Sequence, residues 1–106
     1  MGGRAGRKLA IAARFFMYYD KKPEVRASAL KHGIGADDSL QAAEHPLLTM
    51  DLDHTDSSRE LRLGFDTHGR LLEVVVAKNS EGRQFVIHAM KARKLYRALL
   101  PKGWHR

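Results

Sequence analysis

The chain has 106 residues, a formal net charge of +7 and no cysteine. This length fits one domain, and the lack of thiols excludes disulfide bonds and zinc sites with thiolate ligands. The absence of cysteine fits a cytoplasmic protein, which is what we expect. No stretch approaches the ~20 apolar residues of a membrane-spanning helix, so we expect no membrane association.

The charge is sorted by segment. Residues 1–36 carry a net charge of +6, residues 37–60 a net −6 and residues 61–106 a net +7. Two basic segments on either side of an acidic one predict a surface that binds a polyanion, with the acidic segment elsewhere. Nucleic acid is the commonest partner of that kind, and we expect the polyanion to be RNA.

The N-terminal part changes from basic and glycine-rich to aromatic. We expect residues 1–14 to be a basic, flexible extension and residues 15–106 to form a single domain. Phe15–Tyr19 is compatible with a short strand, because aromatic side chains favour strands.

Two helices are expected next. Pro23 suits the first turn of a helix, and Val25 and Ala29 lie four residues apart, so the pattern predicts a helix over Pro23–His32. A second helix is expected from about Asp37 to Glu44, where an acidic first turn favours the helix dipole.

The apolar period then changes from 3.6 to 2, which predicts strands. The four expected strands are Leu48–Leu52, Glu60–Phe65, Leu71–Ala77 and Gln84–Ala89. Short turns at Asp66–Gly69 and Asn79–Gly82 make neighbouring strands antiparallel. Leu71–Ala77 is nearly all apolar, so it is expected at the centre of the sheet.

The chain closes with a basic helix expected over Lys91–Leu100, which Pro101 ends. The expected architecture is an α+β domain with two N-terminal helices, an antiparallel three- to four-stranded sheet and a C-terminal helix.

The search for chemistry begins with metal ligands. The acidic run Asp51–Asp56 could hold a divalent cation through carboxylate oxygens. An acidic strand end that continues into a solvated loop is the simpler interpretation, and we expect neither a metal nor a cofactor.

Basic and histidine side chains near the last strand point to RNA chemistry. Cleavage through the 2′-OH of RNA needs a general base, a general acid and cations that stabilise the charged transition state. Strand alternation puts Phe85 and Ile87 on one face and His88 on the other. We expect His88 to transfer protons, and Arg62 and Arg93 to contact phosphate. The competing interpretation is a solvated basic helix face beside a structural histidine.

Three short motifs resemble those of BrnT-type toxins, which belong to bacterial toxin–antitoxin systems and have a RelE-like ribonuclease fold. They are Lys31-His32-Gly33-Ile34, Gly64-Phe65-Asp66 leading to Gly69–Val76, and Val86–Met90 before a basic segment. The resemblance covers roughly residues 20–100. It implies metal-independent RNA cleavage and a cognate, DNA-binding antitoxin as partner, with which the toxin can form an oligomer.

The resemblance also assigns residues by position. Lys31 and His32 match the family's Lys-His-Gly segment, and Lys91 matches the basic residue after the last strand. We expect both lysines to contact phosphate in the transition state. His32 is a second candidate for proton transfer, and the alternative is a structural histidine at the end of a helix. Met90 stands where the family usually has arginine. Either His88 and Arg93 substitute for that arginine, or the chain is a non-catalytic domain that binds nucleic acid or a partner protein.

Overall fold

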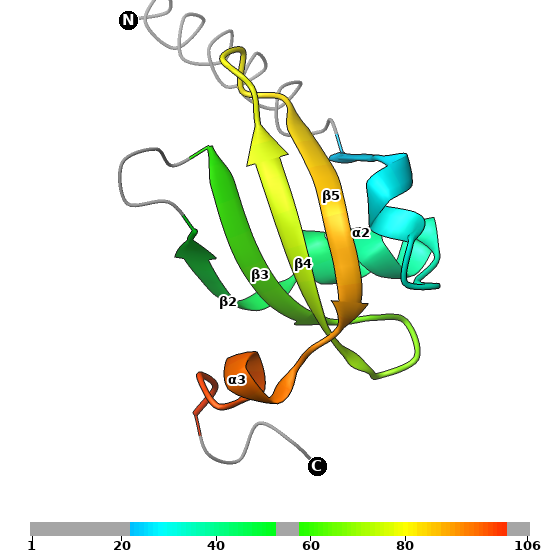
Figure 1. Ribbon diagram of the computed structural model, residues 1–106, viewed down its shortest axis with the longest axis vertical. Coiled ribbons are helices and arrows are strands. Elements are labelled where there is room, and N and C mark those ends of the chain that lie inside the picture. The colour runs from blue at the N-terminus through cyan, green and yellow to red at the C-terminus, as the bar shows by residue number, and fades with distance from the viewer. Residues whose placement is uncertain (1–21, 53–57, 102–106) are drawn as a thin grey trace, which may run out of the picture.

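The computed structural model describes residues 22–52 and 58–101. It is an α+β fold on a five-stranded mixed sheet with strand order β1-β5-β4-β3-β2 (Figure 1). The strands are β1 (Glu24–Val25), β2 (Pro46–Asp51), β3 (Arg59–Phe65), β4 (Leu71–Lys78) and β5 (Gln84–Lys91), and the helices are the 3-10 helix η1 (Ala27–Leu30), α2 (Ala36–Glu44) and α3 (Lys94–Arg97). The apolar strand β4 lies at the centre, as its composition predicts. None of the described helices is long and apolar enough to span a membrane.

The expected pair of N-terminal helices is wrong, because the segment Pro23–His32 forms β1 and η1 instead. β1 runs parallel to the start of β5. The Arg26 amide donates to the Val86 carbonyl at 2.9 Å, and the Ser28 hydroxyl donates to the Ile87 carbonyl at 2.7 Å. These bonds satisfy the edge of β5, and they replace the local bonds of a helix.

The expected sheet and C-terminal helix also need correction. β1 adds a parallel strand, so the sheet has five strands and is mixed, where three or four antiparallel strands were expected. Lys91 ends β5, and the Ala92 amide extends the ladder with a 2.9 Å bond to the Leu71 carbonyl. The helix therefore shrinks to α3. The N-terminal predictions up to Tyr19, and residues 53–57 of the acidic run, lie outside the described residues.

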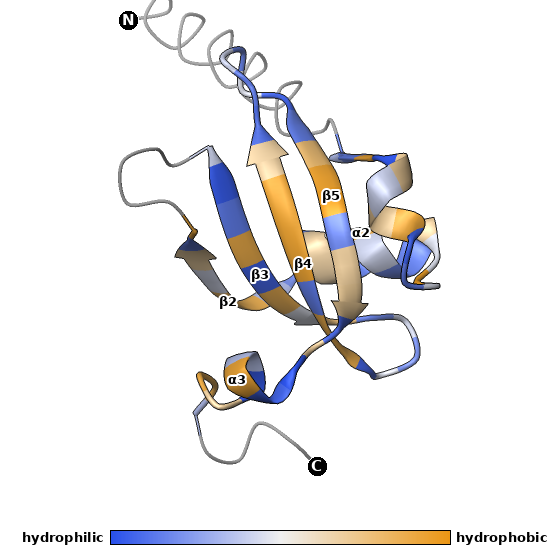
Figure 2. Ribbon diagram, viewed as in Figure 1, coloured by the Kyte–Doolittle hydropathy of each residue, from blue (hydrophilic) through white to orange (hydrophobic). Residues whose placement is uncertain are grey.

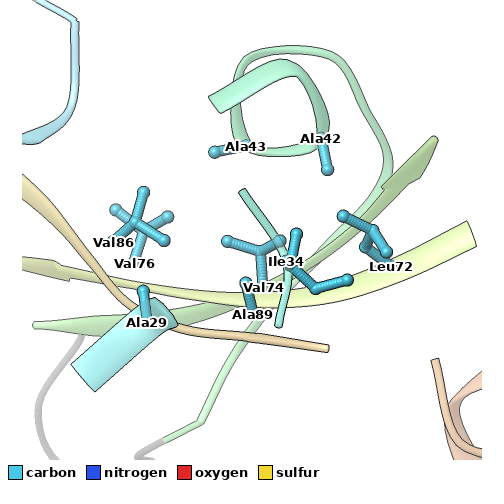
Figure 3. Close-up of a cluster of buried hydrophobic side chains, with 9 residues drawn as sticks. All are labelled: Ala29, Ile34, Ala42, Ala43, Leu72, Val74, Val76, Val86 and Ala89. Carbon is cyan, nitrogen blue, oxygen red and sulfur yellow. The ribbon is translucent and has the colours of Figure 1, made fainter. Parts of the chain in front are cut away.

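The α2 side of the sheet carries the main core, in which helix alanines face branched side chains of the strands (Figure 3). Its members are Ala29, Ile34, Ala42, Ala43, Leu72, Val74, Val76, Val86 and Ala89. The small alanines let α2 lie close to β3. A Cβ placed on Gly64 would lie 2.5 Å from the Ala42 carbonyl oxygen, so only glycine fits this contact.

The opposite face of the sheet carries a second apolar cluster, which reaches toward α3. Its buried members are Leu61, Leu63, Leu71, Ala92 and Leu100, and Leu48, Phe65, Val75 and Tyr96 pack against them. Figure 1 shows α2 behind the sheet and α3 beyond one end of it. Among the described elements, α2 and η1 thus cover one face, and only the short C-terminal segment contributes to the other.

Candidate active site

A β-bulge in β5 decides which side chains share the face opposite α2. Val86 pairs with Val76 and His88 pairs with Val75, so Ile87 is the extra residue. Val86 and Ala89 are both fully buried in the α2-side core, although they are three residues apart. His88 therefore projects from the other face, as β-bulges near functional sites commonly re-aim a side chain.

Glu73 of β4 is the centre of the polar group on this face. Its side chain is only 1% exposed. One carboxylate oxygen, Oε1, accepts hydrogen bonds from the backbone amide and the Nε of Arg93, each at 3.0 Å. The other, Oε2, accepts from the Arg93 Nη2 at 2.8 Å and lies 3.0 Å from the His88 Nε2. Figure 2 shows β4 and β5 as mainly apolar strands with polar interruptions.

The electrostatics of this group keep the carboxylate charged. Burial alone raises the pKa of Glu73, but the hydrogen bonds from Arg93 and His88 outweigh burial and hold that pKa below its usual value. The hydrogen bonds to Glu73 and the negative charge of its carboxylate raise the pKa of Arg93. The site thus contains a fixed carboxylate–guanidinium pair with a histidine attached.

The Glu73 carboxylate also fixes the tautomer of His88. An ionised carboxylate can only accept hydrogen bonds, so the Nε2 of a neutral His88 must carry the hydrogen. The Nδ1 then carries the lone pair, and none of the described residues donates a hydrogen bond to it. His88 is only partly buried, with 28% of its side chain exposed. Its Nδ1 can therefore accept a proton from a bound molecule.

His32 joins this site from the other side of the β5 edge. Its ring centre lies 5.4 Å from that of His88, and the ring planes meet at 71°. The hydrogen bonds from Arg26 and Ser28 to β5 hold the chain before His32 along that strand. Two histidines that were selected from different parts of the sequence therefore lie together.

The four basic residues predicted for the site are placed differently from one another. Lys31 directly precedes His32 and is exposed, and Lys91 is exposed at the end of β5. Arg93 is half-exposed and bound to Glu73. Arg62 lies apart from this group. Its Nη1 donates to the carbonyl of Ala43 near the end of α2, at 2.8 Å, and its Nε donates to the Glu60 carboxylate, at 2.9 Å.

A second polar cluster ties α2 to the β3–β4 turn. Asp38, Asp66 and His68 lie close enough for a metal ion. Arg70, however, bonds to both carboxylates. Hydrogen bonds from Thr67 lower the pKa of Asp38, and those from Arg70 outweigh burial and lower the pKa of Asp66. These oxygens are used in holding the turn to the helix, so this cluster is structural.

Glu73 is the functional candidate that the sequence analysis missed. Its signal is a lone carboxylate in the apolar run Leu71–Ala77, which was predicted to be the central strand. A buried carboxylate needs a charged or hydrogen-bonding partner, and this rule directs attention to it.

The chain was compared with protein-family models, with curated proteins and with solved structures, and none of the three comparisons finds a match.

Proposed function

We propose that the protein is a ribonuclease that cleaves RNA through attack of the 2′-OH on the adjacent phosphorus, without a metal ion. The observation that carries the proposal is the hydrogen bond from His88 to the buried Glu73 carboxylate, with the His32 ring beside it. Two proton-transfer groups on one partly exposed surface are what this reaction requires.

In this mechanism, the Nδ1 of His88 takes the proton from the 2′-OH. The oxygen then attacks the phosphorus, and the bond from phosphorus to the 5′ oxygen breaks. His32 donates a proton to the leaving oxygen, and the product end is a 2′,3′-cyclic phosphate. Glu73 stabilises the imidazolium that forms on His88, because the carboxylate stays ionised beside it.

Cations stabilise the charge that develops on the phosphate. Lys31 is exposed and directly precedes His32. Lys91 is exposed at the end of β5, but it pairs with Leu72 of the α2-side core, so the register puts it on the face opposite to His88. The Nη1 of Arg93 is not used by Glu73, which takes the Nε and the Nη2. Lys31 and Arg93 therefore supply positive charge where a phosphate would lie over His88.

The wider biological role follows from the sequence resemblance. We propose that the protein is the toxin of a type II toxin–antitoxin module, that it acts on RNA in the cytoplasm, and that a cognate DNA-binding antitoxin binds and inhibits it. Co-purification with the product of the adjacent gene, followed by loss of cleavage in the complex, tests this role.

A non-catalytic domain that binds nucleic acid or a partner protein is the second candidate. Two observations favour it. The Arg93 guanidinium is bound to Glu73 through two of its nitrogens, which leaves less of it for phosphate, and Met90 replaces the arginine expected from the resemblance.

RNA cleavage in EDTA tests the proposal and separates the two candidates. We expect His88→Ala to reduce cleavage by roughly 10²–10⁴-fold, the effect typical of a lost acid–base group, and His32→Ala to reduce it as well. His45→Ala is the matched control, because His45 is an exposed residue at the end of α2.

Thermal unfolding of each variant shows that it is folded. A folded His88→Ala protein with unchanged cleavage contradicts the mechanism. RNA binding without cleavage by the wild-type protein supports the second candidate instead.

A further inference from the structure

An arginine–aromatic cluster lies at the start of β5, outside the site described above. The Arg26 guanidinium carbon lies 4.2 Å from the centre of the Phe85 ring, and that of Arg83 lies 5.5 Å from it. Both distances are within the range of cation–π attraction. The cluster joins β1, which Arg26 follows, to the turn that Arg83 ends before β5.

The β-bulge puts this cluster on the same face as the candidate active site. Phe85 pairs with Ala77 and His88 pairs with Val75, and these two partners lie two residues apart on β4. Since side chains at i and i+2 of a strand share a face, Phe85 and His88 both project away from α2. A regular strand would have put them on opposite faces.

The two arginines keep much of their capacity to bind an anion. Within the described residues, the ion pair of Arg83 is a long, exposed one with Glu24, at 3.7 Å. Arg26 makes no ion pair with any carboxylate in the described part of the chain, and its guanidinium is held against the Phe85 ring. Arg62, Arg70 and Arg93, by contrast, are bound by partly or fully buried carboxylates.

We propose that Arg26, Phe85 and Arg83 form a binding subsite for single-stranded RNA, which holds a nucleotide next to the one that is cleaved at His88. The identity of the ligand rests on the proposed function. The arginine N–H edges bind phosphate, and an unpaired base stacks on the ring and guanidinium planes. The partners of Phe85 and His88 on β4, Ala77 and Val75, lie two residues apart. At ~3.3 Å per residue this is a span of about 7 Å, which a short single strand can bridge.

The test uses a labelled single-stranded oligonucleotide with 2′-O-methyl groups, which has no free 2′-OH and is not a substrate. Binding is measured by fluorescence anisotropy over a series of salt concentrations. Arg26→Gln and Arg83→Gln should each weaken binding and reduce the log–log salt slope by roughly 0.7, the effect of one phosphate contact. Phe85→Leu should weaken binding by about 5-fold or more, as loss of base stacking does.

Two further arms test the charge and the strandedness. Glu24→Gln should tighten binding, because it removes a negative charge beside Arg83. Lys94→Gln is the matched control for loss of one exposed positive charge, and it should weaken binding less than either arginine variant, since Lys94 lies in α3 at the other end of β5. Duplex RNA of the same sequence should bind more weakly and should not respond to Phe85→Leu, because its bases are already stacked.

The outcomes separate this subsite from the cleavage reaction. Wild-type affinity in folded Arg26→Gln and Phe85→Leu proteins overturns the proposal, and so does a wild-type protein that fails to bind the oligonucleotide. If binding depends on Arg26 and Phe85 while unmodified RNA is not cleaved, the subsite stands and the ribonuclease mechanism fails. Arg26 is exposed, so its variant gives a reading even if Phe85→Leu does not fold.

Discussion

Replacing Glu73 with glutamine removes the negative charge of the side chain that binds both Arg93 and His88. The shape of the side chain is kept. The glutamine carbonyl can still accept hydrogen bonds on one side. Its amide group, however, would face the donors that now bind Oε2, namely the Nη2 of Arg93 and the Nε2 of His88. The substitution therefore exchanges two charge-assisted hydrogen bonds for contacts between donors.

The expected cost follows from those two bonds. Hydrogen bonds to charged groups contribute about 1.5–3 kcal/mol each, and loss of the desolvation cost of a buried carboxylate offsets part of this. We expect Glu73→Gln to lower the free energy of unfolding by about 2 kcal/mol at pH 7. For a domain of this size that corresponds to a fall in Tm of roughly 10 °C.

The pH dependence identifies the charge as the cause. The pKa of Glu73 is lowered in the folded protein, so its contribution to stability is complete above the ordinary glutamate pKa of about 4.3 and is lost as the pH falls through the folded-state value. The stability difference between the wild type and Glu73→Gln should therefore shrink as the pH falls below the ordinary glutamate pKa.

Urea unfolding at several pH values measures this difference, and Glu44→Gln is the control because Glu44 is an exposed carboxylate at the end of α2. Equal stability of the wild type and Glu73→Gln at pH 7 would refute the reasoning, as would a difference that persists undiminished at pH 3.

The tautomer of His88 is a separate prediction. When the His88 ring is neutral, ¹⁵N NMR spectra of the wild-type protein should show it as the Nε2–H tautomer.

Two further predictions concern the packing of α2. Gly64→Ala should destabilise the protein by about 1–3 kcal/mol in thermal or urea unfolding, because its Cβ would meet the backbone of Ala42 and cannot be relieved by a side-chain rotation; Gly35→Ala, where nothing lies within 4 Å, should cost clearly less. Arg62→Gln should lower stability by about 1–2 kcal/mol through loss of its bonds to Ala43 and Glu60; a folded variant with RNA cleavage reduced far beyond its unfolded fraction would show instead that Arg62 contacts the substrate.

The antiparallel strands of the sheet could be predicted from the sequence because the patterns that indicate them lie within a few neighbouring residues. Alternating apolar residues and glycine turns predict β3, β4 and the hairpins, and an apolar run predicts the central strand. The prediction of a helix over Pro23–His32 was wrong because the four-residue spacing of Val25 and Ala29 also suits a short strand followed by a 3-10 turn. Val25 pairs beside Val86 in the sheet, and Ala29 reaches the same core from a 3-10 turn. The edge of β5 that holds this segment is distant in the sequence, since Ser28 bonds to Ile87 and Val25 pairs with Val86.

The candidate site could be predicted only in part, because its geometry depends on contacts between residues that are distant in the sequence. Histidine and basic residues can be selected by their chemistry, and the structure does place His32 beside His88. The β-bulge at Ile87 leaves no mark in the sequence, because every residue of Phe85–Ala89 also suits a regular strand. The sequence analysis therefore put Phe85 and His88 on opposite faces, whereas the structure puts Phe85 on the same face as His88. Arg62 was selected for its charge, although its partner at the end of α2 comes from a different part of the chain.

The two edges of the sheet differ in their capacity to recruit another strand. At one edge, β1 and the Ser28 hydroxyl occupy carbonyls of β5, which protects that edge against intermolecular pairing. At the other edge, β2 pairs only with β3 among the described elements, and it exposes the side chains of Leu47 and Met50. A strand added to this sheet would therefore pair with β2, and it would leave the edge beside the two histidines uncovered.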